Sequence, residues 1–490
     1  MNYGNIGTNS IELLFDGSYT DIIVHRTDGY SYNNIFGNSY IDSNVLSNKS
    51  YQYYITPYYN EISGNQYNTL LSTYTMSYIS YCISGTITSS SIQLIIDGSY
   101  QFFTLSRNNV DLSYVATGKI HVDSGLLPNT IYNYNLISYN NSNIRGNSCI
   151  TGSICTMPTL INVQYGTITS TKILLYVEGS YNSMYVLRSD GFNETKTDVS
   201  SNTYTSIVSP DVSYNFSVYV FNSAGVRSVN TITTLPMFSL PIIISVSFGL
   251  ITTTTIDLSF NGIYDYITIR RNNGKYISVE SETTTYNKNY IDTGLQPNND
   301  YNYVITPYNA YNFSGEYKYT QYVYTLPQLL TVTYSDISTN SILLNYTGYY
   351  NYVSIYRNNI MLTTNIFGHF YNDISGIEPN MNYYYTLIPY NGGDISGSSI
   401  SSDSIYTLPI INTFYYSIIQ TNNITLNYTG SYNHINIKRN DGYSYLNITT
   451  TSFSDVYNLT QDLSYNYTIT PYNTSGNSGT PIVTSIVYAL

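Results

Sequence analysis

One tripeptide, Gly-x-Tyr, recurs six times and divides the chain into units of nearly constant length. Its tyrosines are Tyr19, Tyr100, Tyr181, Tyr264, Tyr350 and Tyr432, so successive copies lie 81, 81, 83, 86 and 82 residues apart. An arginine follows each tyrosine by seven residues, at Arg26, Arg107, Arg188, Arg271, Arg357 and Arg439. The 490 residues contain only 17 lysines and arginines, so this shared offset indicates a true repeat. A repeat of this length predicts one small domain per copy.

Short joints set the expected domain boundaries. Five units end in Thr-Leu-Pro or a related tripeptide, at 75–77, 156–158, 234–236, 325–327 and 407–409. We therefore predict six domains, at 1–77, 78–158, 159–236, 237–327, 328–409 and 410–490. Linkers this short, stiffened by proline, predict an extended rod. Tyr3-Gly4 aligns with Tyr165-Gly166, so the first unit lacks roughly the opening of its first strand, and we expect either a frayed terminus or an unpaired sheet edge there.

Each unit has the period-2 pattern of β-strands. In the fourth, Ile256, Leu258 and Phe260 alternate with polar residues, which is typical of a half-buried strand. In four units the strand after Gly-x-Tyr ends in Asn-Gly or Asp-Gly, as at Asp28-Gly29, and these pairs supply the positive φ angles of a tight hairpin. The 62 tyrosines and the frequent Ile and Thr residues also favour pleated strands. The predicted fold class is all-β, a tandem array of antiparallel sandwiches.

The second half of each unit contains an apolar residue six positions before a tyrosine. These tyrosines, called the corner tyrosines below, are Tyr51, Tyr132, Tyr214, Tyr301, Tyr383 and Tyr465. The fourth unit reads Leu295-Gln296-Pro297 before Tyr301, which resembles the Leu-x-Pro-x-x-x-Tyr corner of fibronectin type III domains. The resemblance implies that the ring packs in the core while the hydroxyl bonds a backbone group across the turn.

The resemblance is incomplete in one core layer. The family's core tryptophan is missing, because the chain contains no Trp. We expect Leu94, Leu174 and Leu258 to fill that layer. A related immunoglobulin-like sandwich remains an alternative.

The six repeated arginines have the strand parity of core residues, so we expect them at the inner rim of each sandwich. A charge at such a place must be paired or reach solvent. Five units offer an acid nine or ten residues before the corner tyrosine, and the third offers none; the acids are Asp42, Asp123, Asp292, Asp373 and Asp455. Structural pairing is the favoured interpretation, and a ladder of ligand-binding arginines is the alternative.

The sequence contains no recognisable catalytic or metal-binding pattern. The four histidines, His25, His121, His369 and His434, fall in four different units, and the acidic residues are scattered singly. Metalloprotease, phosphate-loop and nucleophile-elbow motifs are missing. We therefore predict no catalytic residue, no metal ligand and no cofactor, and hence a protein that is not an enzyme.

Charge and cysteine content narrow the possible partners. The net charge is -12 and no basic run exists, so we expect no nucleic-acid partner. We see no signal peptide and no segment apolar enough to span a membrane, so we expect no membrane insertion. Cys149 and Cys155 lie on what we interpret as one strand, about 20 Å apart if extended, too far to bridge. At most one disulfide could form with Cys82, and we expect free thiols.

Composition supplies the last expectation. The Tyr, Asn and Ile bias with fibronectin-like repeats resembles repeat proteins of large AT-rich DNA viruses of protists, although AT-rich codons alone would favour the same residues. This resemblance implies a structural or adhesive protein at the virion surface, in a fibre or filament. The alternatives are a secreted or cell-surface adhesin and a carbohydrate-binding array of a larger enzyme. Expected partners are protein subunits, by self-assembly or neighbour contact, and surface glycans, because exposed tyrosines suit both contacts. The expected location is the virion surface or the extracellular space.

Overall fold

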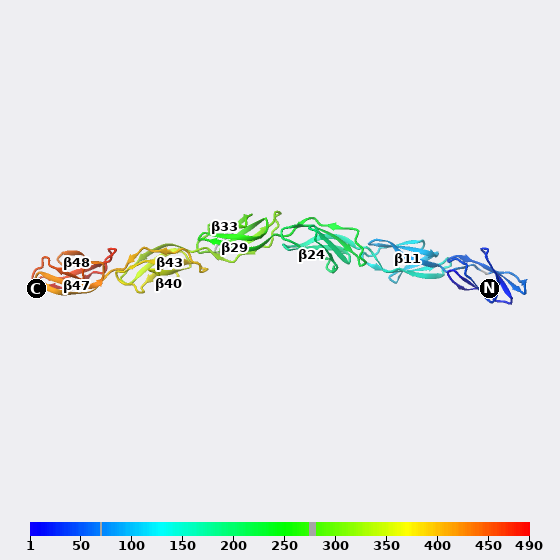
Figure 1. Ribbon diagram of the computed structural model, residues 1–490, viewed down its shortest axis with the longest axis horizontal. Helices are drawn as coiled ribbons and strands as arrows, with labels where there is room; N and C mark the ends of the chain where they lie inside the picture. The colour runs from blue at the N-terminus through cyan, green and yellow to red at the C-terminus, as the bar shows by residue number, and fades with distance from the viewer. Residues whose placement is uncertain (69–70, 274–280) are drawn as a thin grey trace. The chain divides into compact units, whose positions relative to one another are not determined.

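A computed structural model describes residues 1–68, 71–273 and 281–490. All regular secondary structure in these residues is β-strand, as the strand arrows of Figure 1 show. The chain divides into two compact units, Met1–Ser239 and Leu240–Leu490. Every ladder between strands in the described residues is antiparallel, which agrees with the predicted all-β class.

Each repeat contributes one three-stranded sheet. Its middle strand is the one that precedes Gly-x-Tyr or contains its glycine, and the other two strands flank it. These sheets are β1 (Asn2–Ile6), β2 (Ile11–Leu14) and β5 (Ser39–Asp42); β11 (Tyr78–Ile87), β12 (Ser91–Ser99) and β15 (Ile120–Ser124); β20 (Thr159–Ile168), β21 (Lys172–Ser180) and β24 (Thr203–Ile207); β29 (Ile242–Ile251), β30 (Thr255–Ile263) and β33 (Asn289–Thr293); β37 (Gln328–Ser335), β38 (Ile342–Tyr349) and β41 (Phe370–Asp373); β46 (Ile410–Gln420), β47 (Asn423–Ser431) and β50 (Ser452–Asp455).

A second, larger sheet faces the first in each repeat. Its central pair is the strand that contains the repeated arginine and the strand that follows the corner tyrosine or, in the fourth repeat, contains it. The strands are β4 (Ser31–Ile35), β3 (Asp21–Arg26), β7 (Tyr53–Tyr59), β8 (Ile62–Ser63) and β9 (Tyr67–Asn68); β14 (Val110–Ala116), β13 (Phe102–Arg107), β17 (Tyr134–Tyr139) and β18 (Arg145–Ile150); β23 (Asn193–Lys196), β22 (Ser183–Arg188), β26 (Phe216–Phe221) and β27 (Ile232–Thr233); β32 (Ser281–Thr285), β31 (Tyr266–Asn273), β34 (Asp300–Tyr308), β35 (Lys318–Tyr319) and β36 (Val323–Tyr324); β40 (Ile360–Ile366), β39 (Tyr352–Arg357), β43 (Tyr385–Tyr390) and β44 (Ile400–Ser401); β49 (Ser444–Ile448), β48 (His434–Arg439), β52 (Tyr467–Tyr472) and β53 (Ile482–Val483).

A two-residue strand at the corner tyrosine pairs with the last strand of the same repeat, and in the fourth repeat β34 and β36 make this contact. The five separate pairs are β6 (Ser50–Tyr51) with β10 (Thr73–Tyr74), β16 (Ile131–Tyr132) with β19 (Ile154–Cys155), β25 (Ser213–Tyr214) with β28 (Met237–Phe238), β42 (Asn382–Tyr383) with β45 (Ile405–Tyr406), and β51 (Ser464–Tyr465) with β54 (Val487–Tyr488).

The cores lie between the two sheets of each repeat, because alternate side chains of the middle strands face inward. In the second repeat, Ile92 and Leu94 of β12 pack with Phe103 and Leu105 of β13. Six such core clusters occur among the described residues.

The expectation about the layer of the missing tryptophan was correct in two repeats and wrong in one. Leu94 and Leu258 are fully buried. In the third repeat, Leu174 is only half-buried and Leu175 is the buried residue. The register explains the difference, because Ile173, Leu175 and Val177 share the inward face of β21.

The joint after the third repeat lies five residues beyond its expected place. Thr234 Oγ1 accepts a hydrogen bond from the amide of Phe216, at the start of β26, at 3.0 Å. In the second repeat Thr151 makes the same bond with the amide of Tyr134, so Thr234 corresponds to Thr151. β28, at Met237–Phe238, still pairs with β25, and the division between the two compact units follows Ser239. The tripeptide at 234–236 therefore matches the joint motif in sequence but lies five residues before the joint. The expected boundary at residue 236 was wrong.

The cysteine expectation was also wrong. Cys82 on β11 and Cys149 on β18 form a disulfide, with Cα atoms 6.2 Å apart, and Cys155 is free. The two strands belong to different sheets but lie in contact in the second sandwich. Among the described residues no helix is long and apolar enough to cross a membrane.

Candidate functional site

The six corner tyrosines are buried and make the same hydrogen bond. Each hydroxyl accepts the backbone N–H of the residue five positions earlier, within the turn that leads into the tyrosine. The donors are Leu46 (2.8 Å), Leu127 (2.9 Å), Ser209 (3.1 Å), Gln296 (2.9 Å), Glu378 (3.0 Å) and Thr460 (2.9 Å). Because the ring packs in the core while the oxygen holds the turn, this contact fixes how the chain crosses between the sheets.

The repeated arginines contact both the corner tyrosines and the predicted acids. In the first repeat, Arg26 Nη1 lies 2.8 Å from Asp42 Oδ2, and its guanidinium carbon lies 4.9 Å from the ring centre of Tyr51. The other four predicted acids lie 2.7–3.0 Å from their arginines, as the pairs Arg107–Asp123, Arg271–Asp292, Arg357–Asp373 and Arg439–Asp455. The arginines lie in the larger sheet and the acids in the smaller one, so each ion pair joins the two sheets.

Five further tyrosines complete these clusters, and the sequence analysis missed them. They stand two residues after the corner tyrosine, directly opposite the arginine in the strand register. Their hydroxyls donate to the carboxylate at 2.7–2.8 Å, in the pairs Tyr53–Asp42, Tyr134–Asp123, Tyr303–Asp292, Tyr385–Asp373 and Tyr467–Asp455. We call them the core tyrosines. The signal for them was Tyr-x-Tyr at each of these five corners, in a chain where tyrosine is otherwise abundant.

The third repeat replaces two members of the cluster together. Ser206 occupies the position of the aspartate, opposite Ile173 as Asp123 is opposite Ile92. Phe216 occupies the position of the core tyrosine, opposite Arg188. Arg188 donates instead to Ser206 Oγ at 2.8 Å and to both carboxylate oxygens of Asp190. The one repeat that lacks the buried aspartate of the cluster thus also lacks the core tyrosine that would bind it.

A second aspartate, in the hairpin turn, accompanies the three less exposed arginines. Asp28, Asp190 and Asp441 follow their arginines by two residues and bind the guanidinium at 2.7–2.9 Å. The arginine side chains of these three repeats are 3%, 11% and 0% exposed, against 30%, 17% and 20% for Arg107, Arg271 and Arg357. Arg26 and Arg439 are therefore buried groups and not the rim residues that the sequence predicted.

Burial and hydrogen bonding perturb these groups strongly. Burial alone would raise the pKa of Asp42, but hydrogen bonds from the Asn44 amide, Arg26, Tyr53 and Tyr32 together lower it. Burial and the adjacent Asp42 carboxylate raise the pKa of Tyr53 far above its ordinary value. Burial and the same carboxylate raise the pKa of Tyr32 to about 12. In the first repeat the cluster therefore combines an acid whose pKa is lowered with phenols whose pKa is raised, so the proton stays on the phenols.

Successive repeats within each compact unit are joined by a buried asparagine amide. Asn140 Nδ2 donates to the carbonyl of Thr75 at 3.1 Å, while its Oδ1 accepts the amides of Ser142 and Ile144. The other three bonds, at 3.0–3.1 Å, are Asn222 to Thr156, Asn391 to Thr325 and Asn473 to Thr407. We call this contact the joint clasp. Asn309 has the same loop bonds, and its buried Nδ2 has no hydrogen-bond partner among the described residues.

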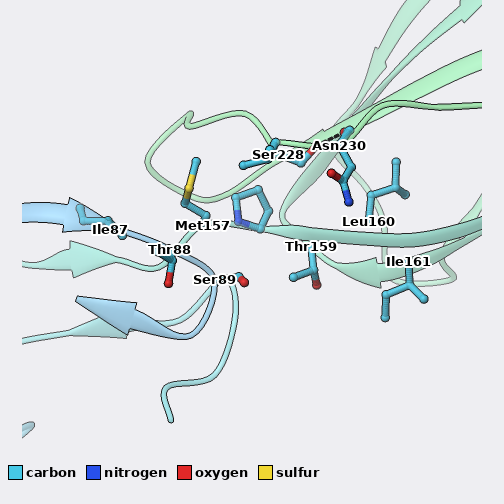
Figure 2. A pocket seen from close by; sticks show the side chains of 11 residues that line it. Ile87, Thr88, Ser89, Met157, Thr159, Leu160, Ile161, Ser228 and Asn230 are labelled. Carbon is cyan, nitrogen blue, oxygen red and sulfur yellow. Dashed lines mark hydrogen bonds between the residues drawn. The ribbon is translucent and has the colours of Figure 1, made fainter. Parts of the chain in front are cut away.

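Two of these joints contain open cavities. One, of about 460 Å³, lies where the second and third repeats meet, lined by Ile87–Ser89, Met157–Ile161 and Ser228–Asn230 (Figure 2). Figure 2 shows Met157 and Thr159 between the Thr88–Ser89 turn and Asn230. The other cavity, of about 490 Å³, lies at the corresponding joint of the first and second repeats, next to Leu46 and Tyr78. Neither lining contains a carboxylate, histidine or cysteine.

The histidines do not come together. His25 and His434 stack on Tyr54 and Tyr472 in the first and sixth repeats, His121 packs at its edge against Phe103, and His369 contacts Tyr350. Among the residues that the structure describes, no group of three or more His, Cys, Asp or Glu side chains could hold a metal ion.

Comparisons with known proteins return fibronectin type III structures. The crystal structure of the FN1–FN3 domains of chicken CNTN1 is 15% identical and covers 51% of this chain and 99% of that one, with a TM-score of 0.21. A two-domain fibronectin type III segment of chicken tenascin is also 15% identical and covers 34% of this chain and 99% of that one, with a TM-score of 0.26. No protein-family model matches the sequence, and no curated protein matches it. At these TM-scores the likeness carries no argument about function.

Proposed function

We propose that this chain is a non-catalytic structural protein that spaces or attaches, at a virion surface or in an extracellular fibre. The observation that carries the proposal is the joint clasp. Within each compact unit, a buried amide bonded across the joint stabilises neighbouring repeats against one another, whereas a flexible tether would need no such bond. The side chains best suited to chemistry, the arginines and acids of the six clusters, are meanwhile bound to partners inside their own repeats.

The disulfide supports a location outside a reducing compartment. Disulfides persist at virion and cell surfaces and are rare in the cytosol. The Cys82–Cys149 bond closes the second sandwich, between strands of its two sheets. The net charge of -12 supports protein or glycan partners over nucleic acid.

The test of this proposal is the place of the chain in its native assembly. Antibodies raised against residues 1–490 should label the outer surface of intact, unpermeabilised particles or cells in electron micrographs. Labelling that appears only after the particle or cell is opened would overturn the proposed location. Recombinant chain added in excess should also compete with the native particle and reduce its attachment to its target surface. If attachment is undiminished, the proposed role of the chain is limited to spacing.

The clasp itself is tested by a matched pair of variants. Asn140→Ala removes the donor to Thr75, while Asn141→Ala changes an exposed neighbour in the same loop. We expect Asn140→Ala to speed limited proteolysis at the 75–78 joint, and Asn141→Ala to cleave like the wild type. Equal cleavage rates in both variants would show that the amide does not stabilise the joint.

A second function, attachment to glycans, is favoured by paired aromatic rings on the outer face of the larger sheet. Four repeats hold such a pair at the same register position, with ring centres 4.9–5.1 Å apart, as Phe102–Tyr139, Tyr266–Tyr308, Tyr352–Tyr390 and His434–Tyr472. Next to two of them lie acceptors, because Tyr266 and Tyr352 donate to Asn312 and Asp394. Ring faces beside amide and carboxylate oxygens suit a sugar.

Cross-strand aromatic pairs stabilise sheets whether or not they bind a ligand. The ring pairs alone therefore do not establish glycan attachment, and binding has to be measured. A glycan array probed with the full chain should therefore give saturable binding that Tyr390→Ala and Tyr308→Ala reduce together. Tyr415→Ala, which changes an exposed tyrosine on the other sheet of the sixth repeat, is the control. Binding that is the same in all three variants would remove this second function.

A further inference from the structure

The guanidinium of the repeated arginine has an outer edge, formed by Nε and Nη2, which an aspartate of the hairpin turn covers in three repeats. In the sixth repeat, Nη1 of Arg439 bonds Asp455, while Nε and Nη2 bond the two carboxylate oxygens of Asp441 at 2.9 and 2.8 Å. The corresponding contacts of the third and first repeats join Asp190 to Nε and Nη2 of Arg188, and Asp28 to Nε of Arg26. The outer edge is thus a built carboxylate site.

An aromatic ring covers a face of the same three guanidinium groups. Its centre lies 4.2–4.8 Å from the guanidinium carbon, in the pairs Arg26–Tyr30, Arg188–Phe192 and Arg439–Tyr443. The ring stands two residues after the aspartate, so each turn reads Asp-Gly-Tyr or Asp-Gly-Phe. One short turn therefore supplies both a carboxylate for the outer edge and a ring for the face.

The second and fifth repeats have a shorter turn that supplies neither group. Arg107 pairs directly with Val110 around the two-residue turn Asn108-Asn109, and both asparagines have a positive φ, as a type I′ turn requires. Asn108 provides an amide in place of a carboxylate, and its Oδ1 accepts the backbone N–H of Asn133. The fifth repeat has the same turn, with Arg357, Ile360, Asn358-Asn359 and Tyr384 in these places.

The outer edges of Arg107 and Arg357 are therefore open. Both arginines bond through Nη1, to Asp123 and to Asp373 respectively. Among the described residues, Nε and Nη2 of these two arginines have no hydrogen-bond partner, and the side chains are 30% and 20% exposed. The corresponding turn of the fourth repeat lies partly outside the described residues.

We propose that Arg107 and Arg357 each bind an acidic turn of a partner protein, of the form Asp-Gly-Tyr or Asp-Gly-Phe. The partner's carboxylate occupies the outer edge and its ring lies on the guanidinium, as the chain's own turns do in the first, third and sixth repeats. The aspartates that fill those three edges are 37–46% exposed. A carboxylate at this position is thus within reach of another molecule.

The buried acid of the cluster does not prevent this binding. Arg26 and Arg439 each hold a buried aspartate and a turn aspartate together, at 2.7–2.8 Å. Hydrogen bonds from the arginine also lower the pKa of Asp190 and of Asp441 below the ordinary value, so the outer edge stabilises a charged carboxylate.

The filled repeats favour a protein partner over an acidic sugar. A sugar acid carries the carboxylate, but it has no aromatic ring to cover the guanidinium. The inference uses the arginine clusters and neither the joint clasp nor the paired rings, so it stands or falls separately from the proposed function.

The test measures how fast phenylglyoxal, which reacts with guanidinium groups, modifies each arginine of the full chain, as read by mass spectrometry. The probe is a head-to-tail cyclised hairpin peptide whose turn has the sequence of residues 440–443, Asn-Asp-Gly-Tyr. Saturating peptide should slow the modification of Arg107 and Arg357 by about tenfold. Arg145, an exposed arginine of the second repeat, is the control and should react at an unchanged rate. The same hairpin with Asn in place of Asp should protect neither arginine.

A matched pair of turn variants tests the same contact within the chain. Replacing Asn108-Asn109 by Thr-Asp-Gly gives Arg107 the turn of the first repeat, and Thr-Asn-Gly gives that turn without its carboxylate. In the Thr-Asp-Gly variant Arg107 should react slowly with or without the peptide. In the Thr-Asn-Gly variant the peptide should still slow its modification, and Arg357 should be protected by the peptide in both variants.

Four results would each overturn the proposal. They are unchanged modification of Arg107 and Arg357 in the presence of the hairpin, equal protection by the Asn hairpin, equal slowing at Arg145, and fast modification of Arg107 in the Thr-Asp-Gly variant. Protection by glucuronic acid as strong as that by the hairpin would assign the outer edge to an acidic sugar and overturn the protein partner.

Discussion

Tyr134 donates its hydroxyl proton to Asp123 at 2.8 Å, across the two sheets of the second repeat. In the third repeat the corresponding residues are Phe216 and Ser206, so the buried donor and the buried acid are lost together. This pairing has a simple energetic reason. A buried carboxylate without its donor and a buried phenol without its acceptor both incur a desolvation penalty, whereas a repeat without either group avoids it.

The first prediction is that these two residues are coupled. Tyr134→Phe leaves a lone pair of Asp123 without its donor and should cost the second repeat about 1–3 kcal/mol. The double variant Tyr134→Phe with Asp123→Ser copies the third repeat, so its cost should fall below the sum of the single costs by at least about 0.5 kcal/mol. Hydrogen exchange of the β17 amides in the full chain measures each free energy. Strict additivity would show that the shared hydrogen bond contributes nothing.

The corner tyrosines give a second prediction. Tyr301→Phe leaves the backbone amide of Gln296 without the acceptor that the buried Tyr301 supplies, and this should cost about 1–3 kcal/mol. The amide of Gln296 should then exchange faster by the corresponding factor, while Tyr286→Phe, at an exposed residue of the same repeat, leaves it unchanged. Unchanged protection of Gln296 in Tyr301→Phe would mean that the turn is held by other contacts.

The third prediction compares two arginines that the sequence treats alike. Arg439 is fully buried and bonds both Asp441 and Asp455, whereas Arg107 is 30% exposed and, among the described residues, forms its ion pair with Asp123. Lysine is a point charge that cannot reach two carboxylates with a planar fork. Arg439→Lys should therefore cost about 2–4 kcal/mol, and Arg107→Lys less than about 1 kcal/mol because solvent screens that pair. Equal costs, measured by hydrogen exchange in each repeat, would contradict this account.

The sequence predicted the features that a distinct repeated pattern marks, and it missed those whose pattern is hidden or absent. The corner hydrogen bond forms within six residues, so a short pattern was enough to predict which tyrosines lie at the corner. The five arginine–aspartate pairs were also predicted, because strand parity and a constant offset placed both groups near the inner face. The core tyrosines were missed because 62 tyrosines obscured the Tyr-x-Tyr signal. The joint at Ser239 was missed because Thr234-Leu235-Pro236 repeats the joint motif five residues early.

The fourth prediction concerns alkaline pH. Burial, with an adjacent carboxylate, raises the pKa of Tyr53, Tyr134, Tyr303, Tyr385 and Tyr467 well above the ordinary value near 10. A raised folded-state pKa gives stability that is complete below the unfolded pKa and is lost as the pH rises toward the folded value. We therefore expect unfolding above about pH 10, seen by circular dichroism, together with late ionisation of a tyrosine fraction at 295 nm. Full reversible ionisation near pH 10, with the folded spectrum intact, would contradict these buried phenols.

The last prediction concerns the disulfide, which could not be predicted because its cysteines are 67 residues apart in sequence and meet only through tertiary packing. Alkylation of the unreduced, denatured chain should modify one cysteine of the three, Cys155. Because the bond closes a long loop and restricts the unfolded chain, Cys149→Ser should destabilise the second repeat by about 2–4 kcal/mol. Cys155→Ser should leave its stability unchanged, since that thiol is free and makes a weak contact with Ser223 Oγ at 3.5 Å. Reducing agent should reproduce the Cys149→Ser effect in the wild type and leave Cys149→Ser itself unaffected. Alkylation of all three cysteines before reduction would show that the bond does not form.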